Sequence, residues 1–313
     1  MGVSQKENRL GMEKLNKQGC LMKIIEYIDA NNITVEFQDE YKARINTFYK
    51  CFDEGSVWNP YYRYGETSIN HQNCLMKIIE YYNANDIVVE FQDKYKGKVH
   101  TNYWSFLKGN VKNPYYPMVL GIGMIGNKYP SKINNKETKE YNLWKSMLYR
   151  CFDKKTKDKN PTYEDADCCE EWLLYENFYE WLHKQENFNN WGNNRWNIDK
   201  DIFIKGNKFY SPKTCFLVPC NVNSLFINKS NYRGDLPIGV KRSGNSFIAR
   251  CSNPITNNRE YLGSYSTPYY GFLAYKEYKE NLIKEIAQLE YDKGNISTKC
   301  YEAMLNYKVE ITD

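Results

Sequence analysis

Three consecutive charged residues in the middle of the chain, Asp199, Lys200 and Asp201, have side chains suited to phosphate chemistry. Carboxylate oxygens bind hard divalent cations, and a lysine ammonium contacts phosphate oxygens. Two carboxylates and one ammonium within three positions therefore form a candidate site for a metal ion and a phosphate. A structural interpretation stays open, in which the two Asp residues belong to a turn or a strand edge and Lys200 is solvated.

The elements that must position this triplet are expected to begin with a hairpin. The apolar residues Ile198, Ile202 and Ile204 predict a first strand over 198–204. The segment 205–208, Lys-Gly-Asn-Lys, has the composition of a turn, because Gly and Asn tolerate a positive φ. Phe209-Tyr210 then predicts a second strand.

The residues after this hairpin predict a buried segment between two helix starts. Ser211-Pro212 has the pattern of a helix cap followed by a first helical residue. The apolar run Phe216–Val218 predicts a buried segment. Pro219 ends that run, and Asn221 and Asn223 begin the next helix.

Two helices are expected before the hairpin, at 140–152 and 170–183, because apolar residues recur there at helical spacing. The charged stretch 153–158 predicts a loop between them. His183 ends the second helix and is a candidate displaced general base. A lone His at that place is more often a helix-end residue near the negative pole of the helix.

The motifs of this region, taken in order, resemble a group of phage proteins that are similar to His-Asn-His (HNH) endonucleases. The motifs are Trp144-Lys-Ser-Met147, Arg150-Cys151, Pro161-Thr-Tyr163, Cys169-Glu-Glu-Trp172, Glu176-Asn-Phe178, Ile198-Asp-Lys-Asp201, Tyr210-Ser-Pro212, Cys215 and Asn223. The resemblance implies a ββα finger that holds one Mg²⁺ or Mn²⁺ ion, which activates a water molecule for phosphodiester cleavage. It implies Asp199 and Asp201 as metal or water ligands, Lys200 as a phosphate clamp, and Asn207 and Asn223 as orienting groups.

Lys200 is where this chain departs from that family. HNH enzymes have a His at this position, and imidazole takes a proton from water near neutral pH. An ammonium cannot do so unless its pKa is lowered far below its usual value. The finger is therefore expected to be degenerate, and both a surviving endonuclease and a binder without catalysis are compatible with it.

The segment 235–313 predicts a sheet of three antiparallel strands followed by one amphipathic helix. The strands are expected at 239–244, 246–250 and 260–265, and Thr267-Pro268 has the pattern of a helix start. An apolar stripe follows the helix, comprising Phe272, Tyr275, Tyr278, Leu282, Ile286 and Leu289.

This C-terminal pattern resembles the Apetala-two/ethylene-response-factor (ERF) DNA-binding domain. The matching residues are Gly239-Val240, Ala249-Arg250, Leu262-Gly263, Thr267 and Ala274-Tyr275. In that family the sheet enters the major groove of a duplex. The resemblance implies contacts with double-stranded DNA from Lys241, Arg242, Arg250, Arg259 and Tyr261. The alternative is a solvated polar sheet face.

The N-terminal part contains an internal repeat, since Cys20–Tyr27 recurs as Cys74–Tyr81, a shift of 74 − 20 = 54 residues. Alternating side chains predict short strands with few apolar residues, which is typical of small β-barrels of the Src-homology-three (SH3)-like kind. The repeats are placed at 11–64 and, with a linker, 65–126. They resemble repeats at the front of phage nuclease-like proteins and are expected to dock DNA or a host or phage protein.

The composition adds further limits. A net charge of +5 over 313 residues permits nucleic-acid binding without requiring it. The ten Cys residues include no CxxC pair and are interpreted as reduced thiols, so zinc is not expected, although Cys151, Cys169 and Cys215 form a conceivable set. Neither a signal peptide nor a membrane-spanning run is visible, so we expect no membrane partner and a location in the cytoplasm of a bacterial host cell.

These observations predict a three-part α+β protein: two tandem SH3-like barrels, a degenerate HNH-like ββα domain at 137–230 and a DNA-binding sheet and helix at 235–313. The expected function is that of a phage or mobile-element DNA-binding protein derived from HNH endonucleases, with metal-dependent cleavage if activity survives. The alternative is a non-catalytic binder, such as an anti-defence inhibitor of a host nuclease in the manner of anti-CRISPR proteins, or a regulator.

Overall fold

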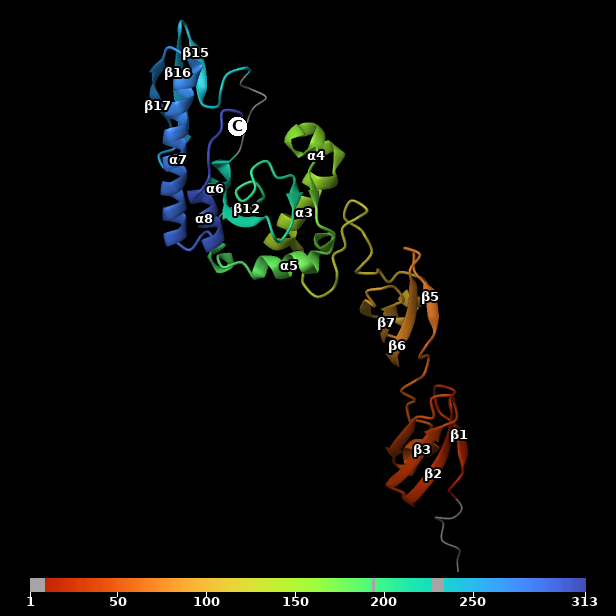
Figure 1. Cartoon of the computed structure of the whole chain (residues 1–313). Coiled ribbons are helices and arrows are strands. Elements are labelled where there is room, and N and C mark those ends of the chain that lie inside the picture. The colour runs from red at the N-terminus through yellow and green to blue at the C-terminus, as the bar shows by residue number, and fades with distance from the viewer. Residues whose placement is uncertain (1–8, 193–194, 227–233) are drawn as a thin grey trace, which may run out of the picture. The chain divides into compact units, whose positions relative to one another are not determined.

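The structure, a computed structural model, describes residues 9–192, 195–226 and 234–313 (Figure 1). The chain divides into two compact units, Met1–Tyr116 and Pro117–Asp313. Antiparallel sheets and helices occur together, which confirms the α+β class. In the described part of the chain, no helix has both the length and the apolar character needed to span a bilayer.

The first repeat is a four-stranded antiparallel sheet followed by a short helix. The strands pair in chain order and are β1 Glu13–Leu15, β2 Leu21–Asp29, β3 Asn32–Phe37 and β4 Arg44–Thr47, and the helix is α1 Tyr49–Asp53. Alternate residues of β2 and β3 are buried because successive side chains of a strand point to opposite faces. They form one core with Phe52 of α1, comprising Met22, Ile24, Ile33, Val35 and Phe37.

The second repeat has the same elements, each displaced by 54 residues. They are β5 Thr67–Ile69, β6 Leu75–Asn83, β7 Asp86–Phe91, β8 Lys98–Thr101 and α2 Tyr103–Leu107, around a core of their own. Each sheet has an open strand order, and in the described residues no pairing joins β1 to β4 or β5 to β8. The predicted repeat of short antiparallel strands is thus confirmed, whereas the SH3-like barrel stays a prediction.

The second unit begins with the hairpin β9 Lys132–Ile133 and β10 Lys136–Glu137, followed by α3 Lys139–Phe152. The prediction of a loop at 153–158 was wrong, since α4 spans Lys154–Lys159. The reason is the cap formed by Asp153, whose Oδ2 accepts hydrogen bonds from the backbone N and the Oγ1 of Thr156.

The single helix predicted at 170–183 is two pieces, the 3-10 turn η2 Glu170–Leu173 and the helix α5 Tyr175–His183. Leu174, between them, has an extended backbone and bridges to Met124. The backbone of Met124 accepts a hydrogen bond from Tyr175 N and donates one to Leu173 O. These bonds replace helical ones at the break.

The strand pairing in the middle of the second unit differs from the predicted hairpin. β12 Trp196–Asp199 pairs antiparallel with β14 Phe216–Pro219, and β13 Phe209–Tyr210 pairs parallel with β11 Asp167–Cys168. The first strand ends at Asp199 instead of residue 204, because its carboxylate accepts two backbone hydrogen bonds and folds the chain into a turn.

No helix follows Ser211-Pro212, where a turn leads into β14. The helix predicted to include Asn221 and Asn223 is present as α6 Cys220–Ser224. β12 and β14 are thus antiparallel and α6 follows β14, but the segment that separates the two strands contains β13, which pairs elsewhere.

β14 is buried on both faces. Phe216 and Val218 belong to the core against the C-terminal helices, while Leu217 belongs to the core around α3 and α5. Burial on both sides explains why this run is apolar without alternation. The first of these cores draws on both sides of the boundary expected at 230–235, and residues 227–233 lie outside the described part.

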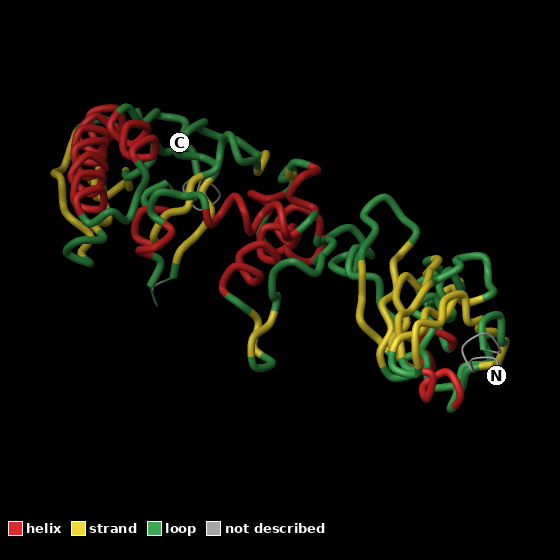
Figure 2. Tube along the Cα trace, turned by 90° about the horizontal axis from the view of Figure 1, so that it is seen from below, coloured by secondary structure: helices red, strands yellow, loops and turns green. Residues whose placement is uncertain are grey.

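The three-stranded sheet and the helix predicted for the C-terminal part are present, and β16 and β17 are longer than predicted. The strands β15 Val240–Ser243, β16 Ser246–Asn253 and β17 Asn258–Tyr265 pair in that order, and α7 Pro268–Asp292 lies along the sheet (Figures 1 and 2). Thr267 caps α7 by accepting a hydrogen bond from Tyr270 N. A last helix, α8 Thr298–Leu305, packs against α7.

Candidate functional site

The Asp199 carboxylate closes the turn at the end of β12. The residue is 5% exposed, and its Oδ1 accepts hydrogen bonds of 2.8 Å from Asp201 N and 2.7 Å from Ile202 N. Burial raises the pKa of Asp199 to about 6, although the two backbone bonds act in the opposite direction. Asp199 thus has a structural role and carries less charge than an exposed carboxylate near neutral pH.

Lys200 is buried and its charge is satisfied within the loop. The residue is 6% exposed, and its Nζ donates a hydrogen bond of 2.8 Å to Asp201 Oδ2. The same Nζ lies 5.8 Å from the centroid of the Tyr210 ring. The Lys200 side chain is therefore not solvated. In this arrangement it also does not point toward a phosphate in solvent.

Asn207 holds the two ends of the loop together. Its Nδ2 donates to Lys200 O at 3.1 Å and to Phe209 O at 2.8 Å, and its Oδ1 accepts from Phe209 N at 3.0 Å. Four of the five residues predicted as catalytic thus share one loop. Asn223 lies half-buried in α6, and in the described residues no side-chain hydrogen bond joins it to that loop.

The donor atoms of this loop fit a divalent cation poorly. Mg²⁺ requires near-octahedral coordination by oxygen. Here Asp199 Oδ1 already accepts two amide hydrogen bonds, and an ammonium lies beside Asp201. Among the residues that the structure describes, no group of three or more His, Cys, Asp and Glu is placed to hold an ion. The Mg²⁺ or Mn²⁺ site stays a prediction.

His183 packs against aromatic rings at the end of α5. Its ring centroid lies 3.9 Å from that of Tyr179 and 3.9 Å from that of Phe188. Its Nε2 is 3.8 Å from Glu140 Oε1. Burial lowers the pKa of His183, and the nearby Glu140 acts in the opposite direction. These contacts agree with a helix-end residue that packs in place.

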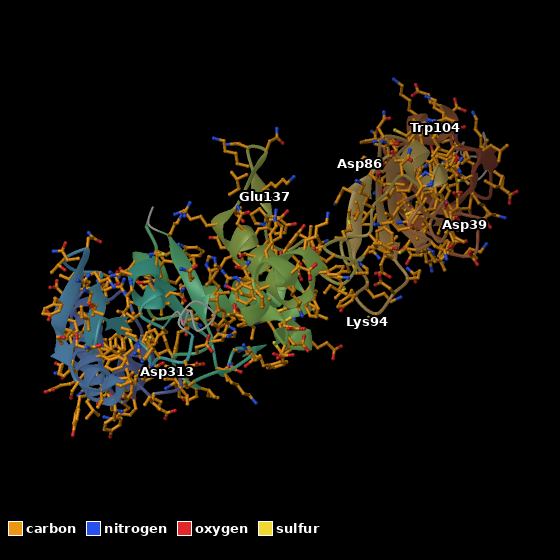
Figure 3. The ribbon with its side chains drawn as sticks, turned by 90° about the horizontal axis from the view of Figure 1, so that it is seen from above. Asp39, Asp86, Lys94, Trp104, Glu137 and Asp313 are labelled. Atoms are coloured by element: carbon orange, nitrogen blue, oxygen red, sulfur yellow. The ribbon has the colours of Figure 1, made fainter. Side chains whose placement is uncertain are left out.

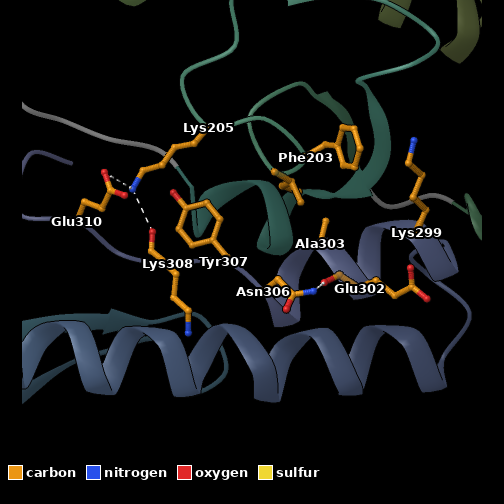
Figure 4. A pocket seen from close by; sticks show the side chains of 10 residues that line it. Phe203, Lys205, Lys299, Glu302, Ala303, Asn306, Tyr307, Lys308 and Glu310 are labelled. Atoms are coloured by element: carbon orange, nitrogen blue, oxygen red, sulfur yellow. Dashed lines mark hydrogen bonds and ion pairs between the residues drawn. The ribbon is translucent and has the colours of Figure 1, made fainter.

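Lys205 links the central loop to the C-terminal segment, a contact that sequence analysis missed. Its Nζ lies 2.6 Å from Asp313 Oδ1 and 3.7 Å from Glu310 Oε2, and donates to Lys308 O at 3.0 Å (Figure 4). A cavity of about 500 Å³ adjoins these residues. No local pattern could reveal partners separated by more than a hundred residues.

The second candidate site is the face of the C-terminal sheet that points away from α7. In β16, Phe247, Ala249 and Cys251 are buried against α7, so Ile248 and Arg250 point to the opposite face. The register places the remaining members on that face, with Lys241 opposite Ile248, Tyr261 opposite Arg250 and Arg259 opposite Ser252. We call Lys241, Arg250, Arg259 and Tyr261 the basic face, and all four are exposed.

Arg242 lies on the other side of the sheet. It is paired with the buried Phe247, and its guanidinium carbon lies 5.1 Å from the centroid of that ring. The structure thus brings together four of the five residues predicted to contact DNA and separates Arg242 from them.

The cations of the basic face are available for a ligand. In the described residues, no carboxylate forms an ion pair with Lys241, Arg250 or Arg259. The guanidinium carbon of Arg250 lies 6.0 Å from the centroid of the Tyr261 ring, which leaves an aromatic surface beside the charge. Three cations and one aromatic side chain can together bind a polyanion.

No family model, no curated protein and no solved structure matches this chain.

Proposed function

We propose that this chain is a double-stranded-DNA-binding protein that contacts the duplex through the basic face. The observation that carries the proposal is the presence of three exposed cations on one side of an antiparallel sheet, without carboxylate partners in the described residues. Neutralisation of phosphates by such cations supplies most of the affinity for DNA. The major groove, about 12 Å wide, admits a β-ribbon.

The residues of the basic face have distinct roles in this proposal. Lys241 neutralises a phosphate, since an ammonium acts as a point charge. Arg250 and Arg259 bind phosphate or bridge the two acceptors of a guanine, which the planar guanidinium allows. Tyr261 packs on a sugar. The resemblance to the Apetala-two/ERF domain supports the assignment of these four residues, although it also implied Arg242, which lies on the other side of the sheet.

The central ββα arrangement, β12–β14–α6, acts in the proposal as a scaffold descended from an HNH-like finger of phage origin. The order of two antiparallel strands and a helix supports that descent. The internal pairing of Lys200 with Asp201 supports a role without catalysis. The duplicated N-terminal sheets, proposed as SH3-like modules, serve as docking modules.

A protein-directed binder is the second candidate. The pair of N-terminal repeats favours this candidate, because each repeat has its own core and the same order of strands and helix. Under this candidate the repeats bind a host nuclease or another phage protein, and affinity for DNA is dispensable.

Two assays on the full chain separate these candidates. In a gel-shift assay, wild type is expected to retard a duplex, Lys241→Gln/Arg250→Gln/Arg259→Gln to lose the shift, and Arg242→Gln to retain it. Plasmid incubated with Mg²⁺, Mn²⁺ or EDTA is expected to stay intact. Metal-dependent cleavage that Asp201→Ala abolishes would restore the endonuclease hypothesis, and absence of any DNA shift would favour the protein-directed binder.

A further inference from the structure

A cavity of about 500 Å³ lies against α3, α4 and the 3-10 turn η1 Pro161–Tyr163. Asn142, Ser146 and Tyr149 line it from α3, where spacings of four and three residues place them on one helix face. Thr156 and Asn160 line it from α4. The cavity is largely open to solvent, and its volume far exceeds that of one phosphate.

Arg150 supplies the cavity with a positive charge that no carboxylate offsets. It lines the cavity, and its guanidinium carbon lies 5.6 Å from the centroid of the Tyr163 ring. Throughout the described residues, no Asp or Glu lies within ion-pair distance of it. The guanidinium hydrogen-bonds the Tyr210 hydroxyl but has no carboxylate counter-charge, which favours an anionic ligand.

Lys145, the other charged residue in the lining, is already paired with a carboxylate. Lys145 Nζ lies 2.7 Å from both carboxylate oxygens of Glu137, which is labelled in Figure 3. The Asp153 carboxylate caps α4 by accepting hydrogen bonds from Thr156. The anion-binding capacity of the cavity therefore rests on Arg150.

We propose that this cavity binds a nucleoside phosphate, with the phosphate on Arg150. A guanidinium presents two parallel donors to phosphate oxygens. The hydroxyl of Ser146 and the amide of Asn160 offer hydrogen bonds to phosphate or sugar. The Thr156 hydroxyl donates to Asp153 Oδ2 and can only accept a bond from the ligand. The rings of Tyr149 and Tyr163 offer faces on which a base stacks.

A nucleoside phosphate has two sources, a free nucleotide or the phosphorylated end of a strand. Both present the same chemistry to Arg150, so the choice of ligands must distinguish them. The site is separate from the basic face, because none of its lining residues belongs to β15, β16 or β17. If the cavity does not bind nucleotide, the proposed binding of a duplex by the basic face can still be tested, and the reverse also holds.

Isothermal titration of the full chain with 5′-mononucleotides, inorganic phosphate and a 5′-phosphorylated single-stranded oligonucleotide tests the proposal. We expect nucleoside phosphate to bind more tightly than inorganic phosphate. Arg150→Gln is expected to weaken binding at least tenfold, and Arg150→Lys to weaken it less, because charge is kept and the two-donor fork is lost. Lys155→Gln, an exposed α4 residue outside the cavity lining, is the control and is expected to bind as wild type does.

A second variant tests the proposal if Arg150→Gln alters folding. Tyr149 is 39% exposed, so Tyr149→Ala is expected to fold normally and to weaken nucleotide binding without changing phosphate binding. Tighter binding of the mononucleotide would support a free nucleotide, and tighter binding of the oligonucleotide would support a strand end. Absence of binding by wild type, or equal affinities in wild type, Arg150→Gln and Tyr149→Ala, would overturn the proposal.

Discussion

Replacing Asp199 by Asn isolates the pH dependence that one buried carboxylate imposes on folding. The pKa of Asp199 is about 6 in the folded chain, against about 3.9 for an Asp in an unfolded chain. Because the folded state holds the proton more tightly, the stability that this proton contributes is present in full below about pH 4. It is lost as the pH rises through about 6, and a shift of about 2 units corresponds to about 3 kcal/mol.

The expected result is that wild type loses about 3 kcal/mol of unfolding free energy relative to Asp199→Asn between pH 3 and pH 7. Asn retains Oδ1 as the acceptor for the amides of Asp201 and Ile202, so the turn is preserved. Urea unfolding of both proteins at several pH values measures the difference, with Asp158→Asn, an exposed site, as the control. A difference that does not change with pH would refute the reasoning. Stabilisation of wild type by Mg²⁺ that Asp199→Asn abolishes would instead place a cation at this carboxylate.

Three further changes test the packing of the fold by urea unfolding. Gly239 has a φ of +77°, and an added Cβ would lie 2.0 Å from the Tyr275 ring, so Gly239→Ala is expected to cost about 2 kcal/mol or more, and a neutral effect would contradict this close approach. Lys205→Met removes the ion pair with Asp313 and is expected to lower the unfolding free energy by about 1 kcal/mol. This loss is expected to shrink as salt is added, and a loss that does not depend on salt would contradict a contribution from the ion pair. Ile24→Ala removes part of a fully buried core and is expected to cost about 2–5 kcal/mol in the first repeat alone. An equal shift of the unfolding transition of the second repeat would be inconsistent with separate cores.

Sequence reasoning succeeded where the pattern is local. The alternation of Met22 and Ile24 with polar neighbours defines β2, and the copy 54 residues later repeats it. Thr267-Pro268 marks the start of α7, because a cap and a first-turn proline are read from two adjacent residues. The cations of the C-terminal sheet were implied by the resemblance to the Apetala-two/ERF domain, and Arg242 among them lies on the other side of the sheet.

The pairing of the central strands depends on contacts that no local pattern carries. Phe209-Tyr210 has strand character, but its partner is Asp167-Cys168, some forty residues earlier. The end of β12 is set by the hydrogen bonds that the Asp199 carboxylate accepts from the backbone. The sequence alone does not predict this strand end, because a single Asp beside apolar residues is also compatible with a longer strand. The burial of Lys200 likewise follows from tertiary packing, so its charge suggested a solvated or phosphate-binding role that the fold does not display.

The salt dependence of binding to a labelled duplex, followed by fluorescence anisotropy, tests the central claim most directly. For each phosphate neutralised, the logarithm of the association constant is expected to fall with the logarithm of salt concentration by a slope of about 0.9. The account predicts that Lys241→Gln/Arg250→Gln/Arg259→Gln reduces the magnitude of this slope by up to about 2.7 and weakens binding at every salt concentration. It predicts that Arg242→Gln, on the opposite side of the sheet, leaves the slope unchanged. Wild-type slope and affinity in the triple variant, or an equal loss in Arg242→Gln, would contradict it.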